Sequence, residues 1–264
     1  MDVSAFRLDG KVAVVTGASR GIGRQVALDC AAAGARLVLG ARGRERLDAT
    51  VAEIVATGAE AIGVVADVGL IADCERLVEA AAARFGTVDV LVNSAAVSGP
   101  SDFLRDIDPA EWERTIAVNL TGTWACIRYA LKYMMAQKSG AIVNVSSFNG
   151  KFPMIKRSPY AASKLGIVGI TRGLALEVGP WGIRVNTVSP GPTEGERVDE
   201  VVRLMAATGG ISEEAVREKL LAMSPLHRMA DNHDVARMVL YLASEAGRAM
   251  TGQDINVTAG AVMY

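Results

Sequence analysis

The sequence predicts one α/β domain with a doubly wound parallel sheet of about seven strands and helices on both faces. Three observations predict this fold. Short β-branched runs alternate with longer helical patterns along the chain. The strand runs are apolar throughout rather than alternating, which is typical of strands buried on both faces. A glycine-rich turn follows the first strand directly, and ligands of such sheets bind at the carboxyl ends of the strands.

The composition favours a single globular unit that binds a small molecule. A length of 264 residues fits one domain, residues 1–264, without a second core. Half of the residues are hydrophobic and 22% are charged, which excludes a disordered chain. The 28 basic and 29 acidic residues leave a net charge of −1. Without a basic excess, neither nucleic acid nor an anionic membrane is an expected partner.

Cysteine usage and the N-terminal residues indicate a cytoplasmic protein. Cys30, Cys74 and Cys126 lie in apolar patterns without a Cys-x-x-Cys motif or a Cys/His pairing, so we expect reduced core thiols and no metal site. Residues 1–10 carry no signal sequence, and no window approaches the roughly 18 apolar residues that span a bilayer.

The elements follow one another as a repeated strand–helix unit. After the first strand, a helix runs to Ala33 and ends at Gly34, which is a natural C-cap. Strands are expected at residues 12–16, 36–40, 62–66, 88–92, 142–145, 183–188 and 254–257. Later helices are expected at about 72–85, 109–135, from 159, and 231–244. The polar segment 193–228 interrupts this alternation of strands and helices, and we expect it to be helical and to cover the substrate.

The first turn, residues 16–23 (Thr-Gly-Ala-Ser-Arg-Gly-Ile-Gly), predicts a Rossmann-type dinucleotide site. Glycines let the backbone approach a pyrophosphate, and the N-terminus of the following helix supplies free N–H groups and a partial positive charge. The alternative is a tight turn that binds nothing.

The same residues also match the Gly-x-Ser-x-Gly nucleophile elbow of α/β-hydrolases, with Ser19 as nucleophile. An elbow follows several strands and an oxyanion loop, whereas only sixteen residues precede Gly17. His227 and His233 lie downstream in polar sequence, where we expect surface side chains. A hydrolase is therefore disfavoured.

A second group of candidate functional residues follows the fifth strand. Ser146 and Ser147 end this strand, Tyr160 follows thirteen residues after Ser147, and Lys164 lies four residues further on the same helical face. A tyrosine has an ordinary pKa near 10, and a nearby ammonium lowers that pKa by favouring the phenolate. The arrangement predicts proton transfer by Tyr160; the alternative is a packed ring beside a solvated charge.

The joint pattern resembles the short-chain dehydrogenase/reductase family over nearly the whole chain. It comprises residues 16–23, Asn93, Asn119, Ser147, Tyr160-Ala-Ala-Ser-Lys164, Gly182-Ile-Arg-Val-Asn186 and Pro190-Gly191. The resemblance implies a one-domain, generally seven-stranded enzyme that moves a hydride between a nicotinamide and an alcohol or carbonyl. It also implies a homo-oligomer, a dimer or homotetramer, built through the helix 109–135 and the helix after Tyr160.

The resemblance implies roles for four catalytic residues. Tyr160 exchanges a proton with the substrate hydroxyl, and Ser147 holds the substrate oxygen. Lys164 lowers the pKa of Tyr160 and binds the nicotinamide ribose. Asn119 holds a water that relays protons from Lys164. These intact residues argue against the alternative of a non-catalytic dinucleotide sensor.

The expected cofactor contacts extend along the carboxyl edge of the sheet. They are Gly17, Ser19, Arg20, Gly21, Ile22, Gly23, Arg42, Asp67, Val68, Asn93, Ala95, Tyr160, Lys164, Pro190, Gly191 and Thr193. One departure is Asn93-Ser94-Ala95-Ala96, where the family usually has Asn-Asn-Ala-Gly. If the last position needs a positive φ, the alanine is strained by about 1 kcal/mol.

The end of the second strand predicts a preference for NADP(H). An acidic residue there binds the ribose hydroxyls of NAD and repels a 2′-phosphate. This chain instead has Ala41 followed by Arg42, whose guanidinium suits a phosphate, and Arg20 is placed to reach it from the glycine turn. NAD(H) is the alternative cofactor.

The sequence indicates the identity of the substrate less clearly than that of the cofactor. Expected lining residues are Phe148, Asn149, Lys151, Met154, Val97, Ser98 and the segment 194–226. Lys151, Lys156 and Arg157 suggest a polar or anionic substrate; the alternative is a solvated basic loop. We therefore expect an oxidoreductase acting on a secondary alcohol or carbonyl of a small polar molecule. The alternative within the family is an NAD-dependent sugar or hydroxy-acid dehydrogenase.

Overall fold

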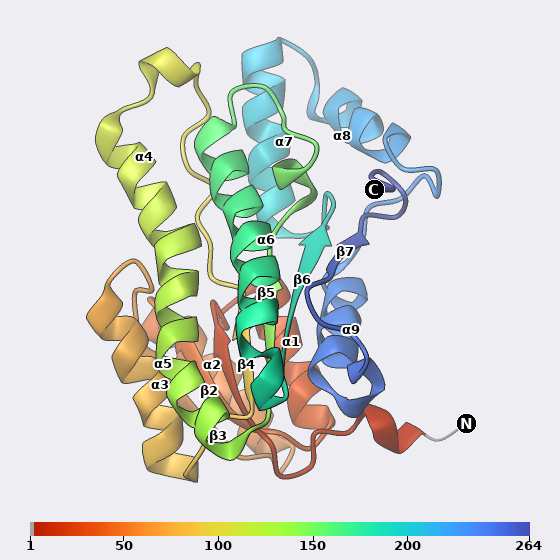
Figure 1. Ribbon diagram of the computed structural model, residues 1–264. Helices are drawn as coiled ribbons and strands as arrows, with labels where there is room; N and C mark the ends of the chain where they lie inside the picture. The colour runs from red at the N-terminus through yellow and green to blue at the C-terminus, as the bar shows by residue number, and fades with distance from the viewer. Residues whose placement is uncertain (1–2) are drawn as a thin grey trace.

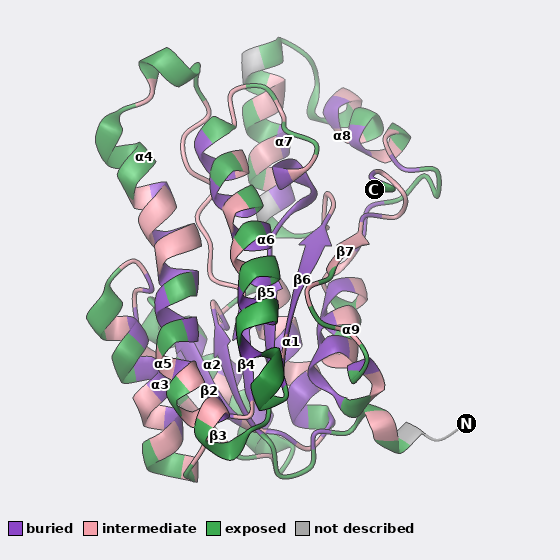
Figure 2. Cartoon of the chain, in the orientation of Figure 1, coloured by how far each residue is buried: buried purple, intermediate pink, exposed green. Residues whose placement is uncertain are grey.

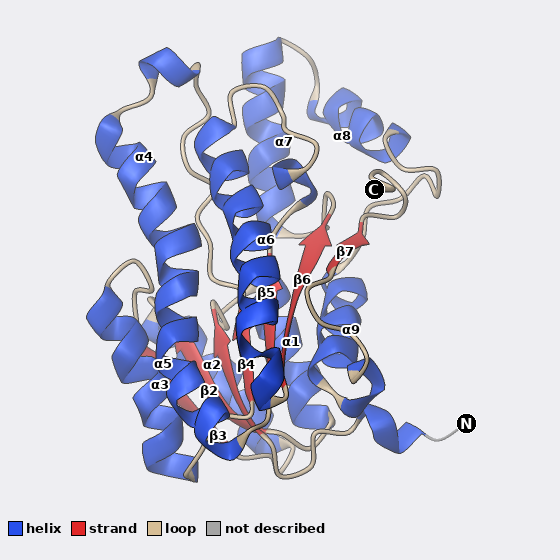
Figure 3. Ribbon diagram, in the orientation of Figure 1, coloured by secondary structure: helices blue, strands red, loops and turns tan. Residues whose placement is uncertain are grey.

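The computed structural model describes residues 3–264, and in them seven strands form one parallel sheet (Figure 3). The spatial order is β3-β2-β1-β4-β5-β6-β7. The strands are β1 (Val12–Thr16), β2 (Arg36–Ala41), β3 (Ala61–Val65), β4 (Val90–Asn93), β5 (Gly140–Val145), β6 (Ile183–Pro190) and β7 (Asp254–Val257). The predicted fold class is confirmed, with strand ends displaced by up to two residues.

Helices cover both faces of this sheet (Figure 1). Those of α type are α1 (Gly21–Ala32), α2 (Arg44–Ala56), α3 (Ile71–Phe85), α4 (Pro109–Ile116), α5 (Gly122–Gln137), α6 (Ser158–Val178), α7 (Glu196–Gly209), α8 (Glu213–Ala222) and α9 (Asn232–Ala243). The side chains of α1, α2 and α9 pack on one face, and those of α3, α5 and α6 pack on the other. No described helix has the length and apolar character needed to cross a membrane.

Successive residues of β1 belong to different cores, which explains why the strand is apolar without alternation. Ala13 and Val15 join the core under α1 and α9, whereas Val12 and Val14 join the core under α3 and α5. All four are fully buried, and the strands of the sheet are drawn mostly in purple in Figure 2. Each face of the sheet therefore excludes water, and a polar residue at any of these positions would lose its hydration.

The strand order reverses between β1 and β4, and the loops that follow these two strands meet at the sheet edge. The hydroxyl of Thr16 accepts hydrogen bonds from the N–H groups of Ser94 (3.0 Å) and Ala95 (3.1 Å). At Gly17, with φ of 69°, a Cβ would lie 2.8 Å from the Cα of Ala95. This position therefore requires glycine, and the crevice beside it is where doubly wound sheets bind their ligands.

The single helix expected at 109–135 is interrupted by one wide turn. A π-helical turn at Ala117–Thr121 joins α4 to α5 and carries Asn119. The helix begins where Asp108 accepts a hydrogen bond from the N–H of Ala110 (2.8 Å), and it ends at Lys138 in the left-handed conformation. Such turns are frequently found at functional sites, and apolar periodicity does not report them.

The expected covering segment, residues 193–228, contains α7 and α8 and lies beyond the carboxyl ends of the strands (Figure 1). These helices bury a small core of their own, formed by Val198, Val202, Val216, Leu220 and Met229. The core does not merge with the two cores of the sheet, so α7 and α8 form a compact unit above the sheet edge.

Two minor expectations are also confirmed. Cys30, Cys74 and Cys126 are buried free thiols. Burial raises the pKa of Cys30 to about 12, so this thiol stays protonated at neutral pH. His227 and His233 are exposed, as expected for surface side chains.

Candidate active site

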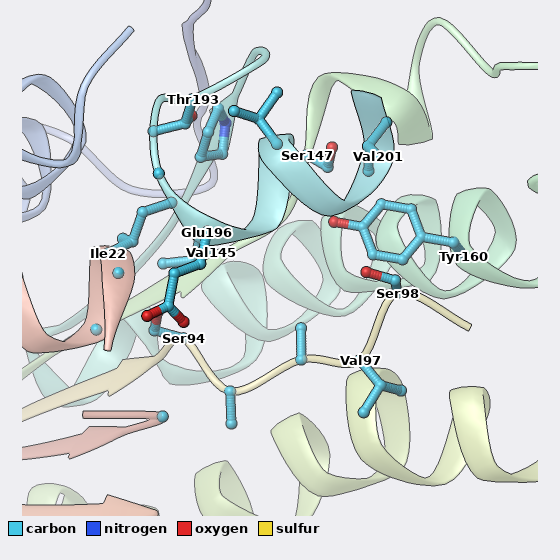
Figure 4. Close-up of a pocket in the computed structure, with 18 of the residues that line it drawn as sticks. Ile22, Ser94, Val97, Ser98, Val145, Ser147, Tyr160, Thr193, Glu196 and Val201 are labelled. Carbon is cyan, nitrogen blue, oxygen red and sulfur yellow. The ribbon is translucent and has the colours of Figure 1, made fainter. Parts of the chain in front are cut away.

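A cavity of about 1160 Å³ extends along the carboxyl edge of the sheet. The glycine turn and the end of β2 line one end, Ser147, Tyr160 and Lys164 line the other, and α7 covers it (Figure 4). Of the expected cofactor and substrate residues, the structure places here Gly17, Ser19, Arg20, Gly21, Ile22, Gly23, Arg42, Asp67, Val68, Ala95, Phe148, Asn149, Pro190, Gly191 and Thr193. Neither histidine of the described chain lines it.

Tyr160 and Lys164 lie in the first turns of α6 and face the end of β5. The ammonium of Lys164 is 5.7 Å from the centroid of the Tyr160 ring and donates a hydrogen bond to the carbonyl of Val145 (2.8 Å). Only 2% of Lys164 is exposed. The guanidinium of Arg157 lies 5.1 Å from the centroid of the same ring. Two cations thus lie near the ring of Tyr160, and positive charge close to a phenol favours its phenolate form.

Ser147 follows β5 in an extended conformation and caps a short turn, Phe148–Gly150, by accepting a hydrogen bond from the N–H of Asn149 (3.2 Å). A Cβ at Gly150 would lie 2.9 Å from the backbone nitrogen of Leu165, so this turn packs directly on α6. The hydroxyls of Ser147 and Tyr160 consequently border the same part of the cavity (Figure 4).

Asn119 is completely buried and does not line the cavity. Its side chain accepts from the N–H of Val97 (2.8 Å) and donates to the carbonyl of Val97 (3.0 Å) and to the hydroxyl of Ser163 (3.1 Å). These bonds tie the loop after β4 to α6. No water is needed to satisfy this side chain, and the water relay expected at Asn119 stays a prediction.

Asn93, expected beside the cofactor, makes contacts within the sheet, and its contact with the cofactor stays a prediction. The residue is 4% exposed, lies outside the cavity and donates through its side chain to the amide oxygen of Asn144 (2.9 Å). Asn144 in turn donates to the hydroxyl of Thr171 on α6 (2.9 Å). Asn93 thus joins β4 to β5 and to α6, because its strand position faces the sheet interior.

Lys151, expected to meet the substrate, is engaged by partners on β7, and its contact with a substrate stays a prediction. Its ammonium lies 2.9 Å from the carboxylate of Asp254 and donates to the amide oxygen of Asn256. Side-chain exposure is 13% for Lys151 and 3% for Asp254, and Lys151 does not line the cavity. Asp254 also accepts from the hydroxyl of Ser189 (2.6 Å). Lys151 therefore links the loop after Ser147 to β6 and β7.

The glycine-turn end of the cavity has the form of a phosphate cradle. Gly21 has φ of 54° and has no atom within 3.9 Å of the place where a Cβ would stand, so α1 presents an open N-terminus. A Cβ at Gly23 would lie 2.4 Å from the carbonyl oxygen of Gly17, so only glycine lets α1 pack this closely. The strain anticipated at Ala96 is not found, because its φ is not positive.

Asp67 follows β3 and pairs with Arg114 of α4 (2.6 Å) while accepting from the N–H of Gly69 (2.9 Å). Partial burial raises the pKa of this carboxyl, but the hydrogen bonds from Arg114 and Gly69 outweigh it and hold the pKa below its usual value. Asp67 is therefore ionised at neutral pH.

Several residues that line the cavity were not predicted from the sequence, among them Arg24, Arg46 and Asn232. Arg46 lies in the first turn of α2, whereas Arg42 precedes that helix, so no helical spacing relates them and only the tertiary structure brings both to the cavity. Glu196 begins α7 within the segment 194–226 that was expected to line the site, but its contact with Arg20 of the glycine turn was not predicted.

The fold and the site together define a class, the dinucleotide-binding α/β oxidoreductases. Two features define this class. One is a parallel sheet with a glycine turn where the strand order reverses, and the other is a Tyr/Lys pair in the same cavity. The model of the short chain dehydrogenase family matches residues 11–206. The protein belongs to this family.

Three similar proteins cover nearly the whole chain. A granaticin polyketide synthase putative ketoacyl reductase from Streptomyces violaceoruber is 40% identical over 96% of this chain and 93% of its own. The structure of an actinorhodin polyketide ketoreductase variant with NADPH is 36% identical, with a TM-score of 0.92 over 96% of this chain and 98% of its own. An NAD⁺-bound xylitol dehydrogenase is 29% identical, with a TM-score of 0.92 over 96% of this chain and 99% of its own.

Proposed function

We propose that the protein is an NADP(H)-dependent oxidoreductase that interconverts a ketone and a secondary alcohol of a small polar substrate, with Tyr160 as general acid and base. One domain, residues 1–264, carries the reaction, and the segment 193–228 covers the substrate. The observation that carries the proposal is the position of Ser147, Tyr160 and Lys164 in a cavity that begins at the glycine turn.

The cavity fits a dinucleotide. Its volume of about 1160 Å³ exceeds that of most single-ligand pockets, which leaves room for a cofactor and a substrate. The open N-terminus of α1 at Gly21 suits the pyrophosphate, and Lys164 suits the ribose beside Tyr160. A bound nicotinamide supplies or accepts the hydride.

The chain's own residues handle the proton and orient the substrate. The Ser147 hydroxyl donates a hydrogen bond to the substrate oxygen, and Tyr160 Oη gives up its proton to that oxygen during reduction or takes it during oxidation. The Lys164 ammonium, fixed by Val145, stabilises the phenolate that remains. Asn119, in the π-helical turn, would hold the water that returns a proton to Lys164.

Two observations support NADP(H) over NAD(H). The end of β2 is the apolar Ala41, and the next residue, Arg42, lines the cavity with an exposed guanidinium. The relative solved with NADPH is 36% identical, whereas the relative solved with NAD⁺ is 29% identical. An NAD-dependent polyol or hydroxy-acid dehydrogenase remains the second candidate, and its support is the TM-score of 0.92 to the xylitol enzyme.

The similarity to ketoacyl and polyketide ketoreductases supports reduction of a keto group as the direction. The substrate end of the cavity combines apolar Phe148 and Met154 with the polar Asn149 and Ser98. Lys156 and Arg157 border it and supply positive charge for a carboxylate or phosphate on the substrate. Cys30, Cys74 and Cys126 are buried free thiols, which fits activity in the reducing cytoplasm.

The test is an absorbance assay of nicotinamide oxidation and reduction. The panel contains 3-oxoacyl thioesters, cyclic diketones, hydroxy acids and polyols, each with NADPH, NADH or their oxidised forms. We expect consumption of NADPH with a ketone. Cofactor binding without turnover of any substrate would indicate a dinucleotide sensor, and faster turnover of polyols with NAD⁺ would favour the second candidate.

A further inference from the structure

Glu196, the first residue of α7, bridges two arginines on the opposite wall of the cavity. Its carboxylate lies 3.1 Å from Nη1 of Arg20 in the glycine turn and 3.1 Å from Nη1 of Arg46 on α2. Figure 4 shows this carboxylate reaching into the cavity from the covering segment. A negative charge of the covering segment thus lies at the end of the cavity opposite Tyr160.

Arg20 and Arg46 are also positioned to bind a phosphate group. Arg20, Arg42 and Arg46 line one end of the cavity beside Ala41 at the end of β2, and guanidinium groups bind phosphate in a bidentate manner. Among the described residues the Arg42 guanidinium makes no hydrogen bond or ion pair, although its positive charge acts on the carboxylate of Asp67. One of three cations is therefore available, while Glu196 engages the other two.

We propose that Glu196 competes with the 2′-phosphate of NADP(H) for Arg20 and Arg46 and so determines how strongly the enzyme prefers NADP(H) over NAD(H). This inference rests on the proposed function. Binding of the phosphate releases Glu196, and the covering segment then separates from the glycine turn. NAD(H) has no 2′-phosphate and leaves the bridge intact.

The ion pairs of Glu196 with Arg20 and Arg46 are weak enough for another anion to replace the carboxylate. The side chains of Arg20, Arg46 and Glu196 are 50%, 60% and 59% exposed, and solvated ion pairs of this kind are weak. Hydrogen bonds from Arg20 and Arg46 hold the pKa of Glu196 below its usual value, so its charge is present at neutral pH. A phosphate with nearly two negative charges can displace one carboxylate.

The covering segment can respond as a unit. Helix α7 packs mainly against α8, and both share the core of Val198, Val202 and Leu220 rather than the cores of the sheet. The Glu196 bridge joins this unit to the glycine turn and to α2. Its release therefore frees one end of α7 without exposing the sheet cores.

The experiment measures calorimetric binding of adenosine 2′,5′-diphosphate and adenosine 5′-diphosphate to the wild type and to Glu196→Gln. These fragments carry or lack the 2′-phosphate and need no catalysis. We expect Glu196→Gln to bind the 2′-phosphorylated fragment about threefold or more tightly than the wild type does, with binding of the other fragment unchanged. Glu200→Gln is the matched control, because Glu200 lies 4.0 Å from Arg20 and its substitution removes the same charge; we expect a smaller gain.

Three results overturn the inference. An unchanged ratio of the two affinities in Glu196→Gln, with the wild type still preferring the 2′-phosphorylated fragment, refutes it and leaves the proposed function standing. Weaker binding of the fragment without the 2′-phosphate would show that Glu196 is a ribose ligand. A wild type that binds both fragments equally would refute the NADP(H) preference and the inference with it. Circular dichroism of the variant verifies that it is folded.

Discussion

The ammonium of Lys164 donates a hydrogen bond to the carbonyl oxygen of Val145 at 2.8 Å, two residues before Ser147 in the chain. A second bond runs beside it, from the hydroxyl of Ser146 to the carbonyl of Lys164 (2.7 Å). Together these bonds hold the end of β5 against the first turns of α6. Each bond joins a side-chain donor of one element to a backbone carbonyl of the other, so the segments that carry Ser147 and Tyr160 are held together, as a precise catalytic geometry needs.

Tyr160→Phe tests the general acid and base. The change keeps the ring between Lys164 and Arg157 and removes only the phenolic oxygen. We expect turnover to fall by about 10² or more while the dissociation constant of the cofactor stays within about twofold. Turnover is followed by nicotinamide absorbance and binding by fluorescence. Near-normal turnover would refute the proposed mechanism.

Ala41→Asp with Arg42→Ile tests the cofactor preference. The new carboxylate accepts hydrogen bonds from both ribose hydroxyls and repels a 2′-phosphate, and the second change removes the Arg42 guanidinium. We expect kcat/KM for NADPH to fall and kcat/KM for NADH to rise, so that their ratio drops by at least about tenfold. A wild type with the higher kcat/KM for NADH would contradict our interpretation of the end of β2.

Lys151→Met tests the buried ion pair that the structure revealed. The change leaves the carboxylate of Asp254, 3% exposed, without its cation, and such a loss costs about 3–5 kcal/mol of the free energy of unfolding. The double variant Lys151→Met/Asp254→Leu should recover part of this loss, because no buried charge remains. Urea unfolding measures both, with the exposed Lys219→Met as control. Equal stability of Lys151→Met and wild type would show that the pair is solvated in solution.

Arg114→Met tests the role of Asp67 in acid stability. The pKa of Asp67 is lowered in the folded protein, so on acidification the unfolded chain takes up this proton first. The contribution to stability is present above the ordinary pKa of about 4 and is lost as the pH falls through the lower folded pKa. Without Arg114 we expect a shallower loss of the free energy of unfolding below about pH 4, measured by urea titrations at several pH values. Parallel curves for the two proteins would contradict this.

Light scattering tests the expected dimer or tetramer. Helices α5 and α6 lie side by side and expose Trp124 (39%), Leu165 (52%) and Leu176 (84%), apolar area that a second copy would cover (Figures 1 and 2). We expect a dimer or tetramer at micromolar concentration and dissociation by Leu165→Glu. The matched control is Leu226→Glu, because Leu226 is 64% exposed in the covering segment and its change should leave the mass unaltered. A monomeric wild type would contradict the expectation.

The cofactor end of the site was well determined by local sequence. The glycine turn can be recognised from its own residues, since Gly17 and Gly21 adopt positive φ and Gly23 admits the close approach of α1 to the turn. The Tyr160/Lys164 spacing acts in the same way, because a helix places residues four apart on one face whatever surrounds it. Both features come from short segments with one accessible geometry.

The sequence by itself determined the order of strands and helices, the glycine turn and the pairing of Tyr160 with Lys164, because each depends on backbone periodicity or on residues close in the chain. Only the tertiary structure decided the contacts between distant segments. Lys151 pairs with Asp254, which lies more than a hundred residues later in the chain. Glu196 pairs with Arg20 and Arg46, which belong to the opposite wall of the cavity. Lysine, arginine and glutamate have long side chains that several partners can satisfy, so the packing of the elements selects the partner and the sequence pattern does not.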